Sequence, residues 1–124
     1  RKSVKPSPSV SAREVIQHIV LFKWKETTSA ATIAAIIDGL KKLPETNPSI
    51  VALTYGEAFN DRNQGFTWVF HHAITVTFAS KADLKAYGSE PTHSSLVKGS
   101  ILPNAESVIA VDYVTPVIVG ADHA

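Results

Sequence analysis

Four largely apolar segments of this chain predict β-strands. The segments are residues 15–24, 50–59, 67–79 and 106–117, where side chains two residues apart share one face. Both faces of these strands are largely apolar, which is typical of a sheet that is covered on both sides. The sets expected on one face are Ile16, His18, Val20, Phe22 and Trp24 in the first strand, and Phe70, His72, Ile74, Val76 and Phe78 in the third.

Between the predicted strands, the spacing of apolar residues predicts helices. Apolar residues recur at i, i+3, i+4 and i+7 between residues 33 and 43, the hydroxyl side chains at 27–29 can cap that helix, and Pro44 is expected to end it. A shorter helix is expected to begin after Ser80 and to reach Tyr87. The apolar positions of the first helix are Ile33, Ile36, Ile37, Leu40 and Leu43.

With a further helix starting at Pro91, the order of elements is βαββαβ, which predicts an α+β, ferredoxin-like subunit. Helices on one side of such a sheet leave the other face open, yet the strands are apolar on both faces. A second copy related by a two-fold axis is therefore expected to cover the open face. The sequence indicates one domain at residues 14–119, between a flexible basic arm at 1–13 and a tail at 120–124.

Composition excludes several classes of protein. Residues 1–13 carry four basic side chains and no acidic one, whereas the remainder carries eight basic and eleven acidic ones. The folded body is therefore mildly acidic, which argues against a nucleic-acid partner, and no apolar run is long enough to predict a membrane partner. The chain has no cysteine, so disulfides and thiolate chemistry are excluded. We expect a cytoplasmic location, although the missing initiator methionine leaves organellar or secreted locations open.

The most distinctive chemistry lies in one short segment. Tyr87 and His93 are six residues apart, which on a continuous helix would turn them through about 600° and onto different faces. Gly88 and Pro91 make a continuous helix unfavourable. A break between them would let two helices aim the phenol and the imidazole at one place, as an acid–base pair.

Four motifs in this order carry a resemblance to a known family. They are His18–Lys23, Gly65–Thr67 leading into Val76–Ser80, Tyr87 with Pro91–His93, and Ala110–Tyr113. Over residues 14–115 the chain resembles the stress-responsive dimeric α/β-barrel family. The resemblance implies two ferredoxin-like subunits packed sheet against sheet into a barrel.

The resemblance also implies a chemistry. In a plant polyketide cyclase of that family, which closes a ring by an aldol step, a tyrosine and a histidine six residues apart correspond to Tyr87 and His93. These two are therefore the expected catalytic residues of a cofactor-independent lyase acting on a small hydrophobic carbonyl compound. The expected substrate-binding residues are His18 and His72, which match histidines of that cyclase, and Val20 and Phe22, which share the face of His18.

No metal and no other cofactor are expected. His71 and His72 are adjacent on a strand, so they point to opposite faces and cannot hold one metal together. Two other functions stay open: a non-catalytic stress or defence protein acting as a stable oligomer, and a carrier of small ligands.

Purely structural interpretations stand beside the functional ones. His18 on an apolar face is typical of a hydrogen-bonded core histidine, and Tyr87 of a core aromatic residue. Asp112 interrupts an apolar strand, so its charge must be paired or lie at an edge, for instance at the subunit interface. The chain departs from the cyclase at Gly88, Ser89 and Glu90, where the cyclase has apolar residues and a further histidine.

Overall fold

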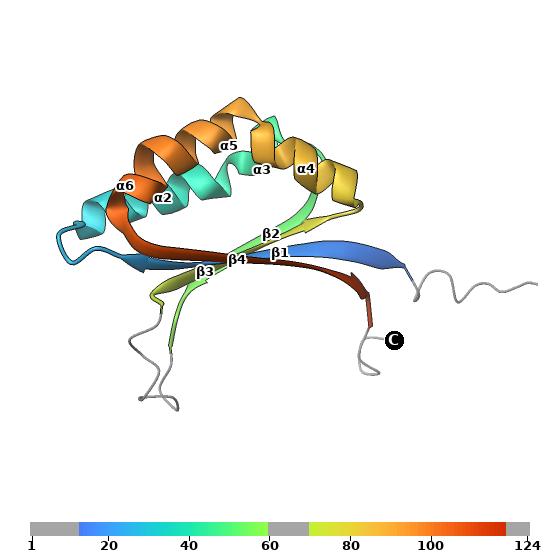
Figure 1. Cartoon of the computed structure of the whole chain (residues 1–124), viewed down its shortest axis with the longest axis horizontal. Coiled ribbons are helices and arrows are strands. Elements are labelled where there is room, and N and C mark those ends of the chain that lie inside the picture. Colours follow the sequence, from blue (N-terminus) through green and yellow to red (C-terminus); the bar gives the residue numbers. More distant parts are fainter. Residues whose placement is uncertain (1–12, 60–69, 119–124) are drawn as a thin grey trace, which may run out of the picture.

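A four-stranded antiparallel sheet carries all the helices on one of its faces (Figure 1). The computed structural model describes residues 13–59 and 70–118, and its strands run in the order β2-β3-β1-β4. The predicted βαββαβ order and the ferredoxin-like α+β fold are confirmed. The elements are β1 (Glu14–Trp24), α2 (Ala30–Lys41), α3 (Leu43–Thr46), β2 (Ile50–Glu57), β3 (His72–Phe78), α4 (Lys81–Ser89), α5 (Pro91–Leu96), the π-helical turn η2 (Val97–Ile101), α6 (Leu102–Asn104) and β4 (Ala105–Pro116).

Side-chain caps set the starts of the two principal helices, as the sequence predicted. Ser29 accepts a hydrogen bond from the Thr32 backbone N–H at 3.1 Å, and Ser80 accepts one from Asp83 N–H at 3.1 Å. The expectation that the first helix ends at Pro44 is confirmed, since α2 stops at Lys41 with Lys42 as its C-cap. Pro44 itself lies in the first turn of α3, where a missing N–H costs nothing.

Three predicted bounds are corrected. Strand β3 begins at His72, so the predicted residues 70 and 71 do not belong to it, and β2 ends at Glu57 rather than at residue 59. Helical structure after Pro91 continues through η2 and α6, further than the sequence indicated. Residues 67–69, the N-terminal arm up to residue 12 and the tail at 120–124 lie outside the described residues.

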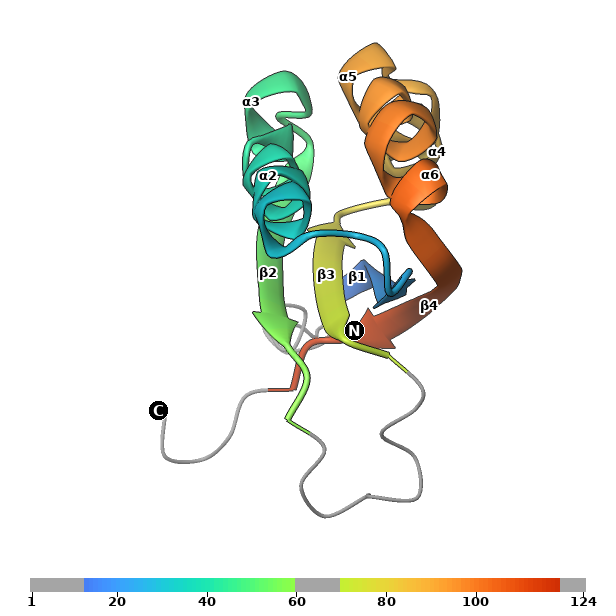
Figure 2. The same cartoon turned by 90° about the vertical axis from the view of Figure 1, so that its left-hand side faces the viewer.

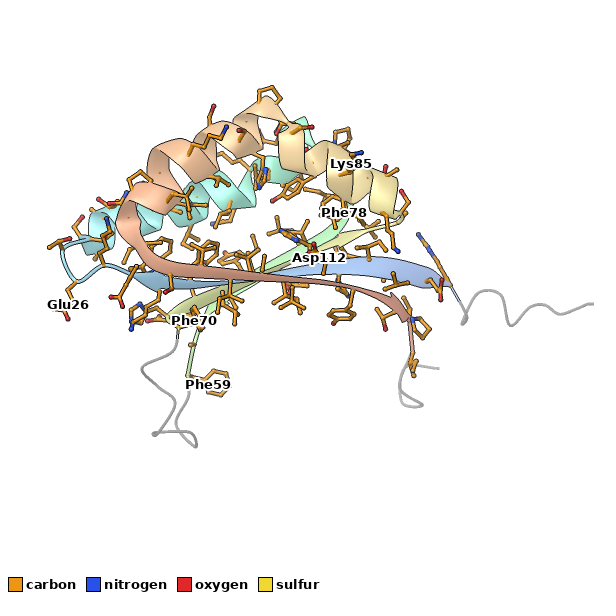
Figure 3. All side chains as sticks on the ribbon, viewed as in Figure 1. Glu26, Phe59, Phe70, Phe78, Lys85 and Asp112 are labelled. Carbon is orange, nitrogen blue, oxygen red and sulfur yellow. The ribbon has the colours of Figure 1, made fainter. Side chains whose placement is uncertain are left out.

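The hydrophobic core lies between the sheet and the helices. Figure 2 shows every helix on the same side of the sheet, and Phe78 points from β3 into this space in Figure 3. Val76, Phe78 and Leu43 have no exposed surface. The other main members of the core are Ile16, Phe22, Trp24, Ile36, Leu40, Ile74, Tyr87 and Ile101.

The opposite face of the sheet is apolar and exposed. On β4 it presents Ile109, Val111 and Tyr113, which are 46%, 52% and 44% exposed, and strand pairing sets Ile109 beside Leu21 and Val111 beside Ile19. An exposed apolar surface on two adjacent strands is typical of an interaction site. Among the described residues, no helix is long and apolar enough to cross a membrane.

Candidate functional site

A cavity of about 170 Å³ lies between the sheet and the helices. Strands β1, β3 and β4 form its floor, and α2, α4, α5, η2 and α6 supply the rest of its wall. The lining is mostly apolar, with three polar side chains. Its residues are His18, Val20, Phe22, Leu40, Ile74, Tyr87, His93, Val97, Ile101, Leu102, Val108 and Ala110.

A break between α4 and α5 brings Tyr87 and His93 together at this cavity. The backbone of Glu90 is extended, with φ −66° and ψ 132°, so α4 ends and α5 starts in a new direction. The two rings are then in contact, with centroids 4.0 Å apart and planes tilted by 31°. The expected helix break is therefore present, and it places an imidazole against a phenol.

His18 joins this pair from the sheet. Its ring centroid lies 5.9 Å from that of Tyr87, and its Nδ1 is hydrogen-bonded to the carboxylate of Asp112 on β4. Strand pairing sets His18 opposite Asp112, and Figure 3 shows Asp112 between the sheet and the helices.

The interpretation of Asp112 changes accordingly. It lies on an edge strand, as an unburied charge should, but its partner is His18 of the same chain rather than a residue across a subunit interface. The only signal in the sequence was a charge in an apolar strand.

Burial sets the protonation of Tyr87 and His93. Burial lowers the pKa of His93 below its usual 6.5, and the nearby His18 lowers it further, while the backbone of Gly88 and the Glu90 carboxylate act in the opposite direction. Burial also raises the pKa of Tyr87, with a smaller contribution from Glu90. At neutral pH the pair is thus a neutral imidazole and a neutral phenol, which are a proton acceptor and a hydrogen-bond donor. The Nδ1 atom of His93 is buried without a hydrogen-bond partner among the described residues.

Glu90 holds the start of α5 in place. Its carboxylate accepts hydrogen bonds from Thr92 N–H at 2.7 Å and from His93 N–H at 3.0 Å. It also accepts one at 2.8 Å from the amide of Asn47, a buried residue next to α3. Desolvation works to raise the pKa of Glu90, but the hydrogen bonds from Thr92, Asn47, His93 and Thr46 outweigh it and hold the pKa at about 2. The carboxylate therefore stays charged over the whole neutral range and ties α5 to α3.

Glu90→Ala is expected to lower the melting temperature by about 5 °C, because it removes a helix cap and leaves the Asn47 amide without this acceptor. Thermal unfolding followed by circular dichroism at pH 7 measures the change. Glu45→Ala, an exposed acidic residue on α3, is the matched control and should shift the melting temperature by no more than about 1 °C. Equal shifts in the two variants would contradict the capping role.

The prediction that His72 shares the cavity with His18, Tyr87 and His93 was wrong. His72 is on the same face of the sheet, but it pairs with Phe22 and Glu57 at the far end of the strands. There its Nδ1 accepts a hydrogen bond from the Trp24 indole at 2.9 Å, and burial lowers its pKa, with Glu57 opposing and His71 adding to the shift. Its role in the described structure is to hold a core tryptophan.

The other predicted positions are found in the cavity. Val20 and Phe22 line its floor beside His18. The sequence did not indicate the part of the wall that η2 and α6 supply, which adds Val97, Ile101 and Leu102.

Within residues 13–59 and 70–118, no three histidine, cysteine or acidic side chains come close enough to hold a metal ion.

The fold and the site together define a small ferredoxin-like domain with a polar cluster in an apolar cavity. Residues 16–115 match the family described as the stress responsive A/B barrel domain, and the chain belongs to that family. It is also 32% identical, over 114 residues, to a stress-response A/B barrel domain-containing protein of Arabidopsis thaliana. That alignment covers 92% of this chain but 42% of the Arabidopsis protein, so the chain spans less than half the length of this curated relative.

Two solved structures show the same fold. The hydroxynitrile lyase of Passiflora edulis has a TM-score of 0.75 and 24% identity, over 83% of this chain and 94% of that enzyme. A dimeric ferredoxin-like protein of unknown function from Thermobifida fusca has a TM-score of 0.70 and 22% identity, over 82% of this chain and 92% of that one. At these identities the likeness concerns the fold alone.

Proposed function

We propose that this domain is a cofactor-independent lyase that makes or breaks a carbon–carbon bond next to a carbonyl group. The observation that carries the proposal is the contact between the Tyr87 and His93 rings at the wall of an apolar cavity. Neutral imidazole is the form of histidine that a general base requires, and the lowered pKa of His93 favours it.

In the synthetic direction, the imidazole of His93 takes the proton from the carbon next to a ketone. The C–H electron pair moves into an enolate, whose oxygen accepts a hydrogen bond from the Tyr87 hydroxyl. The enolate carbon attacks a second carbonyl carbon, and the resulting alkoxide recovers the proton from the imidazolium. No atom is lost or gained, and the reverse sequence cleaves a β-hydroxy carbonyl compound.

His18 has a supporting part in this proposal. Its Nδ1 is hydrogen-bonded to Asp112, which leaves Nε2 to form a hydrogen bond with a polar group of the substrate. The required groups are a base and a hydrogen-bond donor, both of which the chain supplies, so the proposal includes no metal or other cofactor. A polyketide cyclase-like aldol reaction fits this machinery. Hydroxynitrile cleavage, the activity for which the Passiflora edulis structure is named, fits it too.

Tyr87→Phe tests the proposal, because it removes only the hydroxyl and keeps the ring. We expect the turnover number to fall by about 10²-fold, the usual loss for one donor to a developing oxyanion. The measurement is product formation by wild type and variant on a panel of poly-β-ketide thioesters, 1,3-diketones and hydroxynitriles. Tyr55→Phe, an exposed tyrosine on β2 outside the cavity, is the matched control and should leave the rate unchanged.

Equal rates for wild type and Tyr87→Phe would remove Tyr87 from the mechanism. Binding without turnover of any compound in the panel would favour a ligand carrier. Neither binding nor turnover would favour a stress or defence protein that acts as a stable oligomer.

The same proposal includes a homodimer. Its support is the exposed apolar face of the sheet around Ile109, Val111 and Tyr113, which a second sheet of the same kind can cover. The related Thermobifida fusca protein is described as dimeric.

At micromolar concentration we expect light scattering to give about twice the chain mass of 13.3 kDa. Val111→Asp should shift the mass towards one chain, because it places a charge in the middle of this apolar face. Asp38→Ala, an exposed change on α2, is the control and should leave the mass unchanged. A monomeric wild type would overturn the homodimer and would favour a second domain of a longer polypeptide as the cover for this face.

A further inference from the structure

The volume of the cavity limits what can bind beside Tyr87 and His93. At about 170 Å³ it resembles an apolar protein cavity of about 150 Å³ that binds one benzene molecule. Sites for larger, drug-sized ligands have volumes of about 300–1,000 Å³. A long, extended acyl chain does not fit wholly within this space, so part of it would have to extend through the open side into solvent.

The polar groups of the cavity gather at one end. On β1, His18 stands beside Tyr87 and His93, whereas Val20 and Phe22 lie progressively further along the strand, at about 6.6 Å for every two residues. Strand pairing sets Ala110 beside Val20 and Val108 beside Phe22. A ligand with one polar end and one hydrocarbon end therefore has a single favourable orientation, with its oxygen toward Tyr87.

The apolar end is closed by packed aromatic rings. Phe22 stacks on Trp24 with ring centroids 5.2 Å apart and planes 3° apart, and both residues are almost completely buried. The Trp24 indole is in turn hydrogen-bonded to His72. Moving these rings to lengthen the cavity would disturb the core, so the wall is rigid on this side. By contrast, Leu102 is 54% exposed, and it lies at the open side of the cavity.

We propose that the site selects compact carbonyl compounds of about six to nine non-hydrogen atoms, with one oxygen end and one apolar end. This inference rests on the proposed function for the nature of the polar end, but the size limit depends on the cavity alone. The substrates that fit best are short ketones, short 1,3-diketones and their aldol or cyanohydrin adducts, rather than long polyketide thioesters.

Binding of the straight-chain methyl ketones from butan-2-one to decan-2-one tests the size limit. Chemical shift changes in the amide NMR spectrum of the 124-residue chain measure each affinity without requiring turnover. We expect affinity to rise about fourfold for each CH₂ group until the ketone has about nine non-hydrogen atoms, and then to stop rising. Affinity that keeps rising through decan-2-one, or the absence of binding by every ketone, would overturn the inference.

Two variants change the cavity volume in opposite directions. Val97→Ala enlarges the cavity, so affinity should keep rising up to a ketone that is longer by one or two carbon atoms. Ala110→Val makes the cavity smaller, so affinity should stop rising at a shorter ketone. Val51→Ala is the same change at an exposed position outside the cavity, and it should not change the ketone length at which affinity stops rising. An unmoved limit in both cavity variants would show that the site is elsewhere.

The size limit and the lyase function can be disproved independently of each other. Ketones that bind with the expected limit but whose aldol adducts are not turned over would leave the size limit standing and remove the lyase function. Turnover of long polyketide thioesters at rates equal to those of short diketones would retain the function and overturn the size limit.

Discussion

Replacing His93 by alanine is expected to lower turnover by about 10³-fold, the middle of the range for loss of a general base. The imidazole contacts the Tyr87 ring and lines the cavity, and no other lining residue except His18 carries a basic group. His18 approaches Tyr87 from the sheet with ring centroids 5.9 Å apart, compared with 4.0 Å for His93, so His93 is the nearer base to the phenol. Steady-state kinetics with the best substrate of the panel measures the change.

The same variant should keep its fold. Removing His93 loses the contact between its ring and that of Tyr87, worth about 0.5–1.5 kcal/mol. It also removes a buried nitrogen without a partner, which costs about 1–3 kcal/mol to bury. Since these terms oppose each other, we expect the free energy of unfolding to change by no more than about 1 kcal/mol. Thr92→Ala, an exposed neighbour on α5, is the control for both turnover and stability.

The pH profile supplies a second readout for His93. Because the folded protein lowers the pKa of His93 below 6.5, the neutral base persists at pH 7 and activity should fall only at more acidic pH. The free energy of unfolding depends on pH in the same direction. Because the unfolded chain binds a proton at this histidine more readily than the folded protein does, the contribution of neutral His93 to stability is complete above pH 6.5 and declines as the pH falls below that value. His93 would be excluded as the base if the His93→Ala variant kept more than one tenth of the wild-type activity. It would also be excluded if the residual activity of the variant fell at acidic pH in the same way as that of the wild type.

Replacing Phe78 by alanine should lower the free energy of unfolding by about 3–5 kcal/mol, the usual cost of removing a fully buried phenylalanine. Phe78 has no exposed surface, and its ring lies 5.1 Å from that of Tyr87. The cavity left by the substitution would border Tyr87, so we also expect a lower turnover number in the protein that remains folded. Urea unfolding followed by circular dichroism measures the stability.

Phe59→Ala is the matched control for Phe78→Ala. Phe59 is 84% exposed and points away from the helices in Figure 3, so the same chemical change should alter stability by less than about 0.5 kcal/mol. Phe78→Leu keeps most of the buried apolar volume and should lose less than half as much as Phe78→Ala. A loss below about 1 kcal/mol in Phe78→Ala would mean that β3 is not held against α4 as described.

Much of the fold follows from local patterns in the sequence. Alternation along residues 15–24 and 106–117, helical spacing from Ile33 to Leu40, and the hydroxyl caps at Ser29 and Ser80 all operate within a few residues, so they can be seen without the tertiary structure. The break between Tyr87 and His93 is also local, since Gly88 and Pro91 disfavour a continuous helix.

Other features depend on contacts between distant parts of the chain. The bond between His18 and Asp112 joins residues 94 apart and exists because of the register between β1 and β4. Glu90 reaches Asn47, which is 43 residues away, because α3 packs beside the start of α5. Neither partner could be identified from spacing along the sequence.

His72 shows where sequence and tertiary structure differ most clearly. Its alternation with Ile74 and Val76 predicted the correct face of the sheet. Only the strand register decided its position along that face, at the Trp24 end and away from Tyr87. The sequence by itself determined the order of elements, the faces of the strands and the joining of Tyr87 to His93. The tertiary structure decided which groups reach them and how large the cavity is, because both depend on register and packing between segments far apart in the chain.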